Sequence, residues 1–382
     1  MNRIYFPGLN GIRFLAAFGV IVHHIEQIKS LHGMPNLWME PNVQRLGSLC
    51  VSLFFVLSGF LITYLLIEEK DRCGNIDIKK FYIRRALRIW PLYFVITILG
   101  FFVLPNLPTY DVPTFPLTRD VFFWNKLSLY LVFSPHVEAA LYPSVSYAGV
   151  LWSVGVEEWF YSYWPWLVKY ARRILVLVLV VIIVMLLWSR VALFVGRLAY
   201  IANVLRFDCM AVGGLFALLL RSSAHRQLSR AAVNFLFRRD VQLVTYALLA
   251  FALVDAWTFG KLELPAYSIL FATAILNIGS NPNSFFHLEH PLLRWLGEIS
   301  YGLYCYNWIA VVSAVLLVKV LIADISGIYA NLAVYLLGFA LTVLFSALSY
   351  YAIERPFLNL KRQLFTRVVT LTAPGGVRQA GA

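Results

Sequence analysis

Long runs of apolar residues recur along this chain, separated by shorter segments that carry most of its charged residues. A helix needs about 20 predominantly apolar residues to cross a bilayer, and ten runs approach that length. They lie at 9–28, 47–67, 86–104, 151–168, 173–189, 205–220, 241–257, 264–279, 300–321 and 330–353. We therefore predict an all-α fold, a polytopic membrane bundle of about ten transmembrane helices.

Composition and the placement of positive charge agree with this prediction. Of the 382 residues, 60% are hydrophobic and only 13% are charged, whereas soluble domains carry about a quarter charged residues. If the N-terminus is cytoplasmic, 22 of the 32 Lys and Arg residues lie in inner segments, as the positive-inside rule requires. We expect both termini to be cytoplasmic and the chain to be a multi-pass protein of the cytoplasmic membrane.

The net charge of +13 indicates a lipid surface rather than nucleic acid as the partner. Cationic inner segments are attracted to anionic headgroups, and the sequence shows no soluble basic domain or RNA-binding signature.

We expect one membrane domain over residues 1–360 and a basic, disordered cytoplasmic tail over residues 361–382. The outer segment 105–150, rich in proline and aromatic residues, is expected to fold over the outer mouth or dip into the interface.

The first apolar run contains two polar residues that suggest chemistry, Arg13 and His24. A helix turns about 100° per residue, so eleven steps bring both side chains to the same face, roughly 16 Å apart along the axis. Ionisable residues inside a membrane span are costly and therefore mark a functional site by default. His23 points about 80° away and is the weaker candidate. A hydrogen-bonded packing role for His24 stays open.

A second group of cations opens the third run. Arg85 and Arg88 are three residues apart and share one helical face, and Arg84 and Lys80 lie beside them. Guanidinium groups hold phosphates through two parallel hydrogen bonds, so this group is a candidate anion site at the inner surface. A simple positive-inside anchor is the alternative.

Glu157 and Glu158 lie in an otherwise apolar and aromatic stretch, so each must face a cavity, pair with a cation or be protonated. An ionised carboxylate here would receive Arg13 or hold His24 in one tautomer, and a structural ion pair between helices is the alternative.

Ser58 and Gly59 would let two helices approach closely, with Ser58 as a further lining candidate. The run His287, Glu289 and His290 lacks a clear third ligand, so we expect no metal.

Six blocks of the sequence, in order, resemble the acyltransferase-3 family of integral membrane O-acyltransferases. The blocks are LNGIRFLAAFGVIVHH, SLFFVLSGFLIT, FYIRRALRIWPLY, LWSVGVEEWFY, RWLGEISYGLYCYNW and IERPF. The family's Arg-x10-His motif falls on Arg13 and His24, and its Arg-x-x-Arg element on Arg85 and Arg88. Its fourth block falls on Trp152, Ser153, Glu157 and Tyr161. The chain departs from the pattern at Asn307, where many members carry histidine, and we expect it to act without the hydrolase-like extension that some members carry.

This resemblance implies transfer of an acyl group, most often acetyl, from cytoplasmic acyl-coenzyme A to a hydroxyl of an extracytoplasmic carbohydrate or glycolipid. Arg85 and Arg88 would meet the phosphates of acetyl-coenzyme A, and Arg13 would meet the donor or pair with Glu157. His24 would act as general base or be acylated itself. If histidine assists the acceptor in other members, Asn307 must act by hydrogen bonding alone. The acceptor stays open, from lipopolysaccharide, capsule or peptidoglycan to a lipid-linked or secreted molecule.

A transporter or flippase is the main alternative from another class of function. Intramembrane Arg13, His24 and Glu157 would also suit a solute or proton pathway. The sequence shows no internal repeat, and transport leaves the cytoplasmic Arg-x-x-Arg element unexplained. Binding of coenzyme A separates the two hypotheses. A glycan polymerase or ligase, a third possibility, would need a large catalytic outer loop, and only 105–150 could serve.

Overall fold

A computed structural model describes residues 5–110, 121–142, 145, 147–170, 181, 184, 204–254, 263–322 and 324–371. Helices make up the regular structure of these residues, and no strand occurs among them. The α-helices are α1 (Leu9–Leu31), α2 (Pro41–Cys73), α3 (Ile78–Ile98), α4 (Phe123–Leu131), α5 (Pro135–Leu141), α6 (Trp152–Tyr170), α9 (Phe207–Ser222), α10 (Gln227–Leu236), α11 (Arg239–Val254), α12 (Glu263–Ser280), α13 (Pro291–Glu298), α14 (Ser300–Leu321), α15 (Ile328–Ser349) and α16 (Arg355–Leu371). π-Helical turns extend two of them, η1 (Leu99–Val103) after α3 and η6 (Tyr350–Glu354) after α15.

The helices confirm the predicted all-α membrane bundle. Nine of the ten expected runs coincide with α1, α2, α3, α6, α9, α11, α12, α14 and α15, and the run at 173–189 lies outside the described residues except for 181 and 184. By length and composition, four described helices are able to cross a membrane, or five if the bent pair α9 and α10 counts as one. The number of ten spans therefore stays a prediction. α16 makes residues 361–371 of the predicted tail helical, and 372–382 lie outside the description.

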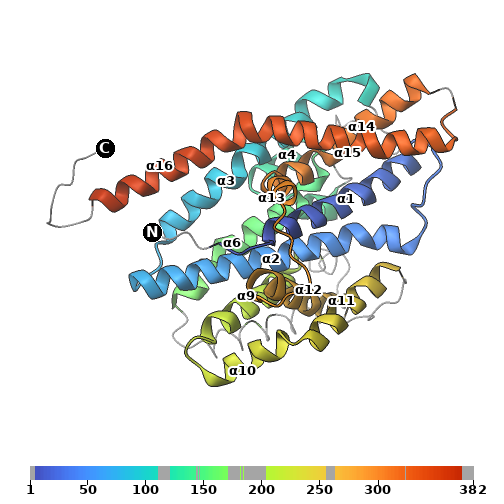
Figure 1. The fold of residues 1–382 in the computed structure, drawn as a ribbon. Helices are drawn as coiled ribbons and strands as arrows, with labels where there is room; N and C mark the ends of the chain where they lie inside the picture. The colour runs from blue at the N-terminus through green and yellow to red at the C-terminus, as the bar shows by residue number, and fades with distance from the viewer. Residues whose placement is uncertain are drawn as a thin grey trace, which may run out of the picture.

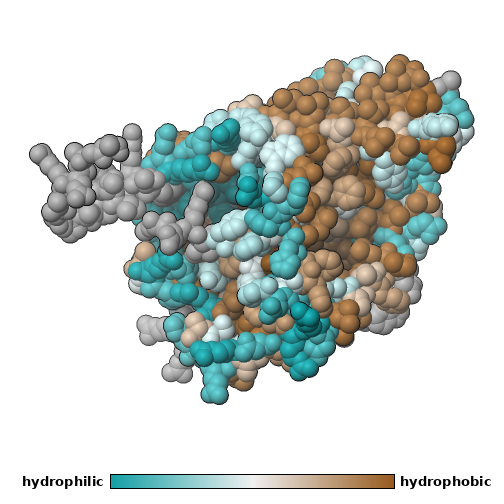
Figure 2. All heavy atoms as spheres, viewed as in Figure 1, coloured by the Kyte–Doolittle hydropathy of each residue, from teal (hydrophilic) through white to brown (hydrophobic). Residues whose placement is uncertain are grey.

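α1 forms the axis of the bundle. It packs against α2 and α14, and α14 packs in turn against α15 (Figure 1). The N-terminal end of α1, the C-terminal end of α2 and α16 lie toward the same end of the molecule, which we call the inner end (Figure 1). Hydrophilic side chains gather there, whereas hydrophobic ones cover the middle and much of the opposite, outer end (Figure 2). The surface thus has the polar-to-apolar layering of a membrane protein.

Close contact between α2 and α9 depends on glycine, as the Ser58-Gly59 pair predicted. A Cβ atom on Gly59 would lie 1.9 Å from the carbonyl oxygen of Met210, and one on Gly213 would lie 2.0 Å from that of Val56. Only a residue without a side chain permits this approach of two backbones, which is how membrane helices gain packing contacts. This packing fixes α2, and with it Ser58, against the rest of the bundle.

The outer end of α1 is held by a buried ion pair. Lys29 Nζ lies 2.5 Å from Glu26 Oε1, and both side chains are almost fully buried. Tyr335 on α15 donates to the same carboxylate at 2.5 Å, and the backbone N–H of Leu37 donates to its other oxygen. Lys29, which lies just after the first predicted run, is therefore part of α1 and links α1 to α15 and the following loop.

The expected outer segment 105–150 is partly helical where it is described. α4 and α5 form a short hairpin beside α3 and α6, fixed by Tyr93, whose hydroxyl donates to the Tyr130 carbonyl at 2.8 Å. Trp159 on α6 donates to Ser134 Oγ at 3.2 Å. Ala139, Gly149 and Val150 from this segment reach a cavity near the outer end of α1.

Candidate active site

Two cavities lie along α1, one toward each end. The inner cavity has a volume of about 120 Å³ and the outer one about 410 Å³. Arg13 lines the inner cavity, and His24 lines the outer one. The two residues of the Arg-x10-His motif therefore lie in two separate cavities of the bundle and do not share one site.

Three arginines line the inner cavity together with one carboxylate, Glu157. They are Arg13 from α1 and Arg85 and Arg88 from α3. Arg13 donates to Asn10 Oδ1 at 3.0 Å, and the Arg85 guanidinium lies 5.6 and 5.7 Å from the rings of Phe81 and Tyr161. Within the described residues none of the three arginines forms an ion pair. Clustered guanidinium groups with free donors form a site for an anion with several oxygens, such as a phosphate.

Glu157 is the carboxylate that faces this cavity. It accepts from Ser58 Oγ at 2.7 Å and from the Tyr161 hydroxyl at 3.0 Å. Its neighbour Glu158 points toward a different hollow between α3 and α6, where Trp90 Nε1 donates to it at 3.2 Å. The sequence left open which carboxylate turns inward, and packing of α6 against α2 decides it. Glu157 and Arg13 line the same cavity and interact electrostatically, but they do not form the suggested ion pair.

Arg84 and Lys80, the other two cations of the predicted phosphate group, lie outside the inner cavity. Arg84 Nη2 is 2.8 Å from Glu69 Oε2, and Lys80 Nζ is 3.0 Å from Asp77 Oδ2. The backbone N–H of Lys80 and then its ammonium group hold the pKa of the Asp77 carboxyl below its usual range. Adjacent arginines therefore differ: Arg84 forms an ion pair with Glu69, whereas Arg85 lines the inner cavity and forms no ion pair with a described residue.

His24 is held by Asn307, from α14, in a defined orientation. The distance between His24 Nδ1 and Asn307 Oδ1 is 2.5 Å, and Asn307 Nδ2 donates to the Tyr304 carbonyl, also at 2.5 Å. Because the amide nitrogen is used by the carbonyl, the amide oxygen must face His24, and Nδ1 must carry the proton. Nε2 is then the unprotonated nitrogen, and it forms no hydrogen bond with any described residue. The Trp308 ring packs edge-on against the imidazole at 5.1 Å.

The outer cavity around His24 combines aromatic rings with neutral polar groups. Its lining includes His23, Gln27, Gln44, Ser48, Trp152 and Trp308. The ring of His23 contacts the Val43 carbonyl through Nδ1 at 2.8 Å, so this imidazole is tied to the backbone of α2. Aromatic faces together with amide and hydroxyl groups are typical of sites that bind small polar ligands.

Tyr304 lies at the boundary between the two cavities. Its side chain and that of Val51 line both chambers. Ser153, which lines the inner one, donates to the Tyr304 hydroxyl at 2.8 Å, and this hydroxyl donates to the Val150 carbonyl at 3.0 Å. One hydrogen-bonded phenol therefore separates the arginine cavity from the imidazole cavity.

Sequence reasoning missed Tyr304, Trp308 and Arg206 as lining residues. Tyr304 and Trp308 flank Asn307 at helical spacing, so an i, i+3, i+4 pattern around Asn307 could have identified one face of α14. Arg206 precedes α9 in a loop and carries no such pattern.

Residues 6–351 match the model of the acyltransferase-3 family, which is described as an acyltransferase domain. The chain belongs to this family. The match covers nearly the whole chain and confirms both the resemblance and the prediction of an acyltransferase. Within the described residues no group of three His, Cys, Asp or Glu side chains could hold a metal ion.

The curated relatives that this chain matches are longer than the chain itself. The O-acetyltransferase OatA of Staphylococcus aureus strain MRSA252 is 26% identical over 400 residues, and the alignment covers 96% of this chain. OatA of strain NCTC 8325 / PS 47 is also 26% identical over 400 residues, with the same 96% coverage. In both cases the chain spans 61% of the relative's length. No solved structure matches the chain.

Proposed function

We propose that this chain is a membrane O-acetyltransferase. It takes an acyl group from acyl-coenzyme A at the inner end and transfers it to a hydroxyl of a carbohydrate or glycolipid in the outer cavity. Family membership and the name of the OatA relatives support the class of reaction. The observation that carries the proposal is the pairing of an anion-binding cavity with an imidazole whose Nε2 is free, on either side of Tyr304.

Donor binding uses the three arginines of the inner cavity. The phosphates of coenzyme A bind Arg13, Arg85 and Arg88, none of which forms an ion pair with a described residue. The pantetheine arm is thin enough to pass between helices and carries the thioester toward Tyr304. The inner end would be the cytoplasmic side of the cell membrane, where acyl-coenzyme A is available and where both termini are expected. Acetyl is the favoured acyl group because the relatives are named for it.

His24 acts as the general base in this scheme. Its Nε2 accepts the proton of the acceptor hydroxyl while the hydroxyl oxygen attacks the thioester carbonyl carbon. The carbon–sulfur bond then breaks, and the thiolate of coenzyme A takes the proton from His24 Nε2. Asn307 Oδ1 holds the proton on Nδ1 throughout and stabilises the imidazolium that forms for an instant. Transfer through an acyl-histidine remains the second route to the same product.

The test is acyl transfer by the purified full chain in nanodiscs with radiolabelled acetyl-coenzyme A and a mixture of carbohydrate acceptors. We expect His24→Ala to abolish transfer while retaining donor binding. Arg85→Ala should weaken donor binding by about tenfold or more, since a hydrogen bond to a charged group contributes about 1.5–3 kcal/mol. Arg72→Ala is the matched control, because Arg72 is paired with Glu68 at the surface near the inner end.

Two results would overturn the proposal. The first is a folded wild-type chain that neither binds nor consumes any acyl-coenzyme A, which would favour a transporter. The second is transfer that continues at the wild-type rate in His24→Ala, which would remove the imidazole from the chemistry.

A further inference from the structure

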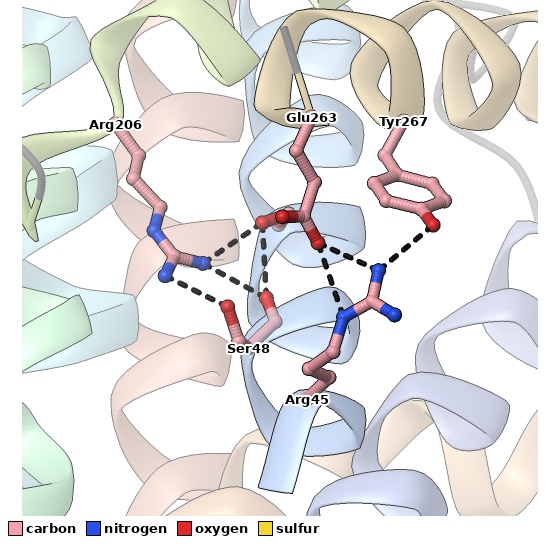
Figure 3. A network of polar contacts seen from close by, with 6 residues as sticks. Arg45, Ser48, Arg206, Glu263 and Tyr267 are labelled. Carbon is pink, nitrogen blue, oxygen red and sulfur yellow. Dashed lines mark hydrogen bonds and ion pairs between the residues drawn. The ribbon is translucent and has the colours of Figure 1, made fainter. Parts of the chain in front are cut away.

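Arg206 is a cation at the edge of the outer cavity with an unusual backbone. Its φ and ψ of 40° and 36° place it in the left-handed region, which a residue with a side chain rarely adopts. The conformation is held by hydrogen bonds from its guanidinium to α2 (Figure 3). Nη1 donates to Ser48 O and Ser52 Oγ, each at 2.9 Å, and Nη2 donates to Ser48 Oγ at 2.8 Å. The side chain also lies 5.9 Å from the ring of Trp152.

These contacts leave one edge of the guanidinium without a partner. Of its five N–H groups, three are used by the two serines, and Nε is buried without any hydrogen-bond partner. The remaining donors are the Nε–H and one N–H of Nη2. A parallel pair of this kind binds carboxylate and phosphate oxygens in a bidentate manner.

Arg206 also forms no ion pair with a described residue. Asp208, two residues along the chain, is close enough to interact with it electrostatically, but the two side chains are not hydrogen-bonded. Arg45, on the same stretch of α2, differs: its Nη2 lies 2.7 Å from Glu263 and 3.0 Å from the Tyr267 hydroxyl (Figure 3). Arg45 thus forms an ion pair within the protein, whereas Arg206 lines the outer cavity without one.

The rest of the outer cavity fits a sugar. Trp152 and Trp308 provide ring faces, and Gln27 and Gln44 provide amide groups for hydroxyls. No carboxylate occurs among the described residues that line it. Because Arg206 is partly buried and forms no ion pair with a described residue, an anionic group on the ligand would gain a charge-assisted hydrogen bond there.

We propose that the outer cavity binds an acceptor sugar that carries an anionic group, a carboxylate or a phosphate, with Arg206 as its counter-ion. The inference rests on the proposed function, because it assigns the outer cavity to the acceptor. It narrows the acceptor to acidic carbohydrates and makes Arg206 the residue that selects for them.

The experiment measures sugar binding by the full chain in nanodiscs without any donor. Tryptophan fluorescence is titrated with glucose, glucuronic acid and glucose 6-phosphate, which compare a neutral sugar with its carboxylate and phosphate forms. We expect at least one acidic form to bind about tenfold or more tightly than glucose. Arg206→Met should lose that preference, and Arg206→Lys should retain part of it. Arg45→Met, which removes a compensated charge outside the cavity, should keep it.

The outcomes separate this inference from the proposed function. Equal binding of all three sugars by the wild type, or an unchanged preference in a folded Arg206→Met variant, would overturn the inference. Tighter binding of one acidic sugar than the other identifies the anion and supports it. Acetyl transfer to glucose and to the acidic sugars at equal rates would leave the acyltransferase intact and reject only the role of Arg206. Thermal melting of each variant checks that loss of the contacts to Ser48 has not unfolded α9.

Discussion

The hydrogen bond between His24 and Asn307 makes the most specific prediction about rate. Asn307 is fully buried, and its amide oxygen is the only described acceptor for His24 Nδ1. Replacing it by leucine, Asn307→Leu, keeps the volume close to constant and removes that acceptor. The bond is to a group that becomes charged during the reaction, so its loss costs about 1.5–3 kcal/mol. We therefore expect kcat to fall about 10- to 150-fold.

The KM for acetyl-coenzyme A should change far less than kcat, because Asn307 does not line the arginine cavity. Asn307→Asp keeps an acceptor oxygen toward His24 and should retain more activity than Asn307→Leu. Ser313→Ala is the matched control, since it also removes a buried hydrogen-bonding group from α14, two turns away. Steady-state kinetics measures each value. Asn307→Leu activity within about threefold of the wild type, or an equal loss in Ser313→Ala, would refute the reasoning.

A double variant tests whether Asn307 acts through His24. If it does, adding Asn307→Leu to His24→Ala should cause no further loss of rate, since residues that act as a unit are strongly non-additive. Two independent losses that add would show that Asn307 acts on something else.

Three further predictions concern the wall between the cavities and the packing of the bundle. Tyr304→Ala opens the boundary between the two cavities. We therefore expect the release of free acetate from acetyl-coenzyme A to rise relative to acetyl transfer. An unchanged ratio of acetate release to transfer would show that Tyr304 does not separate the cavities. Gly59→Ala forces a Cβ against a backbone carbonyl and should destabilise the fold by about 1–3 kcal/mol, whereas Gly338→Ala meets only ordinary contacts and should leave the melting temperature unchanged. Lys29→Met leaves the buried Glu26 carboxylate without its cation, so it should lower the free energy of unfolding by about 3–5 kcal/mol. Adding Glu26→Gln should restore that stability. Unfolding curves in denaturing detergent measure the stability of the Gly59 and Lys29 variants.

The sequence was sufficient to predict the helices and the residues that suggest chemistry. Long apolar runs specify membrane helices because the bilayer demands about 20 apolar residues from each. Polar residues within those runs are conspicuous because they are costly there. Arg13, His24, Arg85 and Glu157 were identified for this reason, and each of them lines a cavity.

Contacts between distant helices could not be predicted in the same way. Asn307 lies 283 positions from His24, and nothing in either local pattern indicates the pairing. The choice between Glu157 and Glu158, and the difference between Arg84 and Arg85, depend on how α3 and α6 rotate against α2. Periodicity within one helix gives the relative direction of its side chains but not the face that meets a neighbour.

Donor and acceptor are expected to meet the enzyme from opposite sides of the membrane, and proteoliposomes test this separation. The full chain is reconstituted with one defined orientation, radiolabelled acetyl-coenzyme A is supplied on the side of the inner end, and a sugar acceptor is trapped on the other side. We expect O-acetylated sugar in the compartment opposite the donor, formed by the wild type and absent with His24→Ala. Acetylated product only in the compartment that holds acetyl-coenzyme A would contradict it.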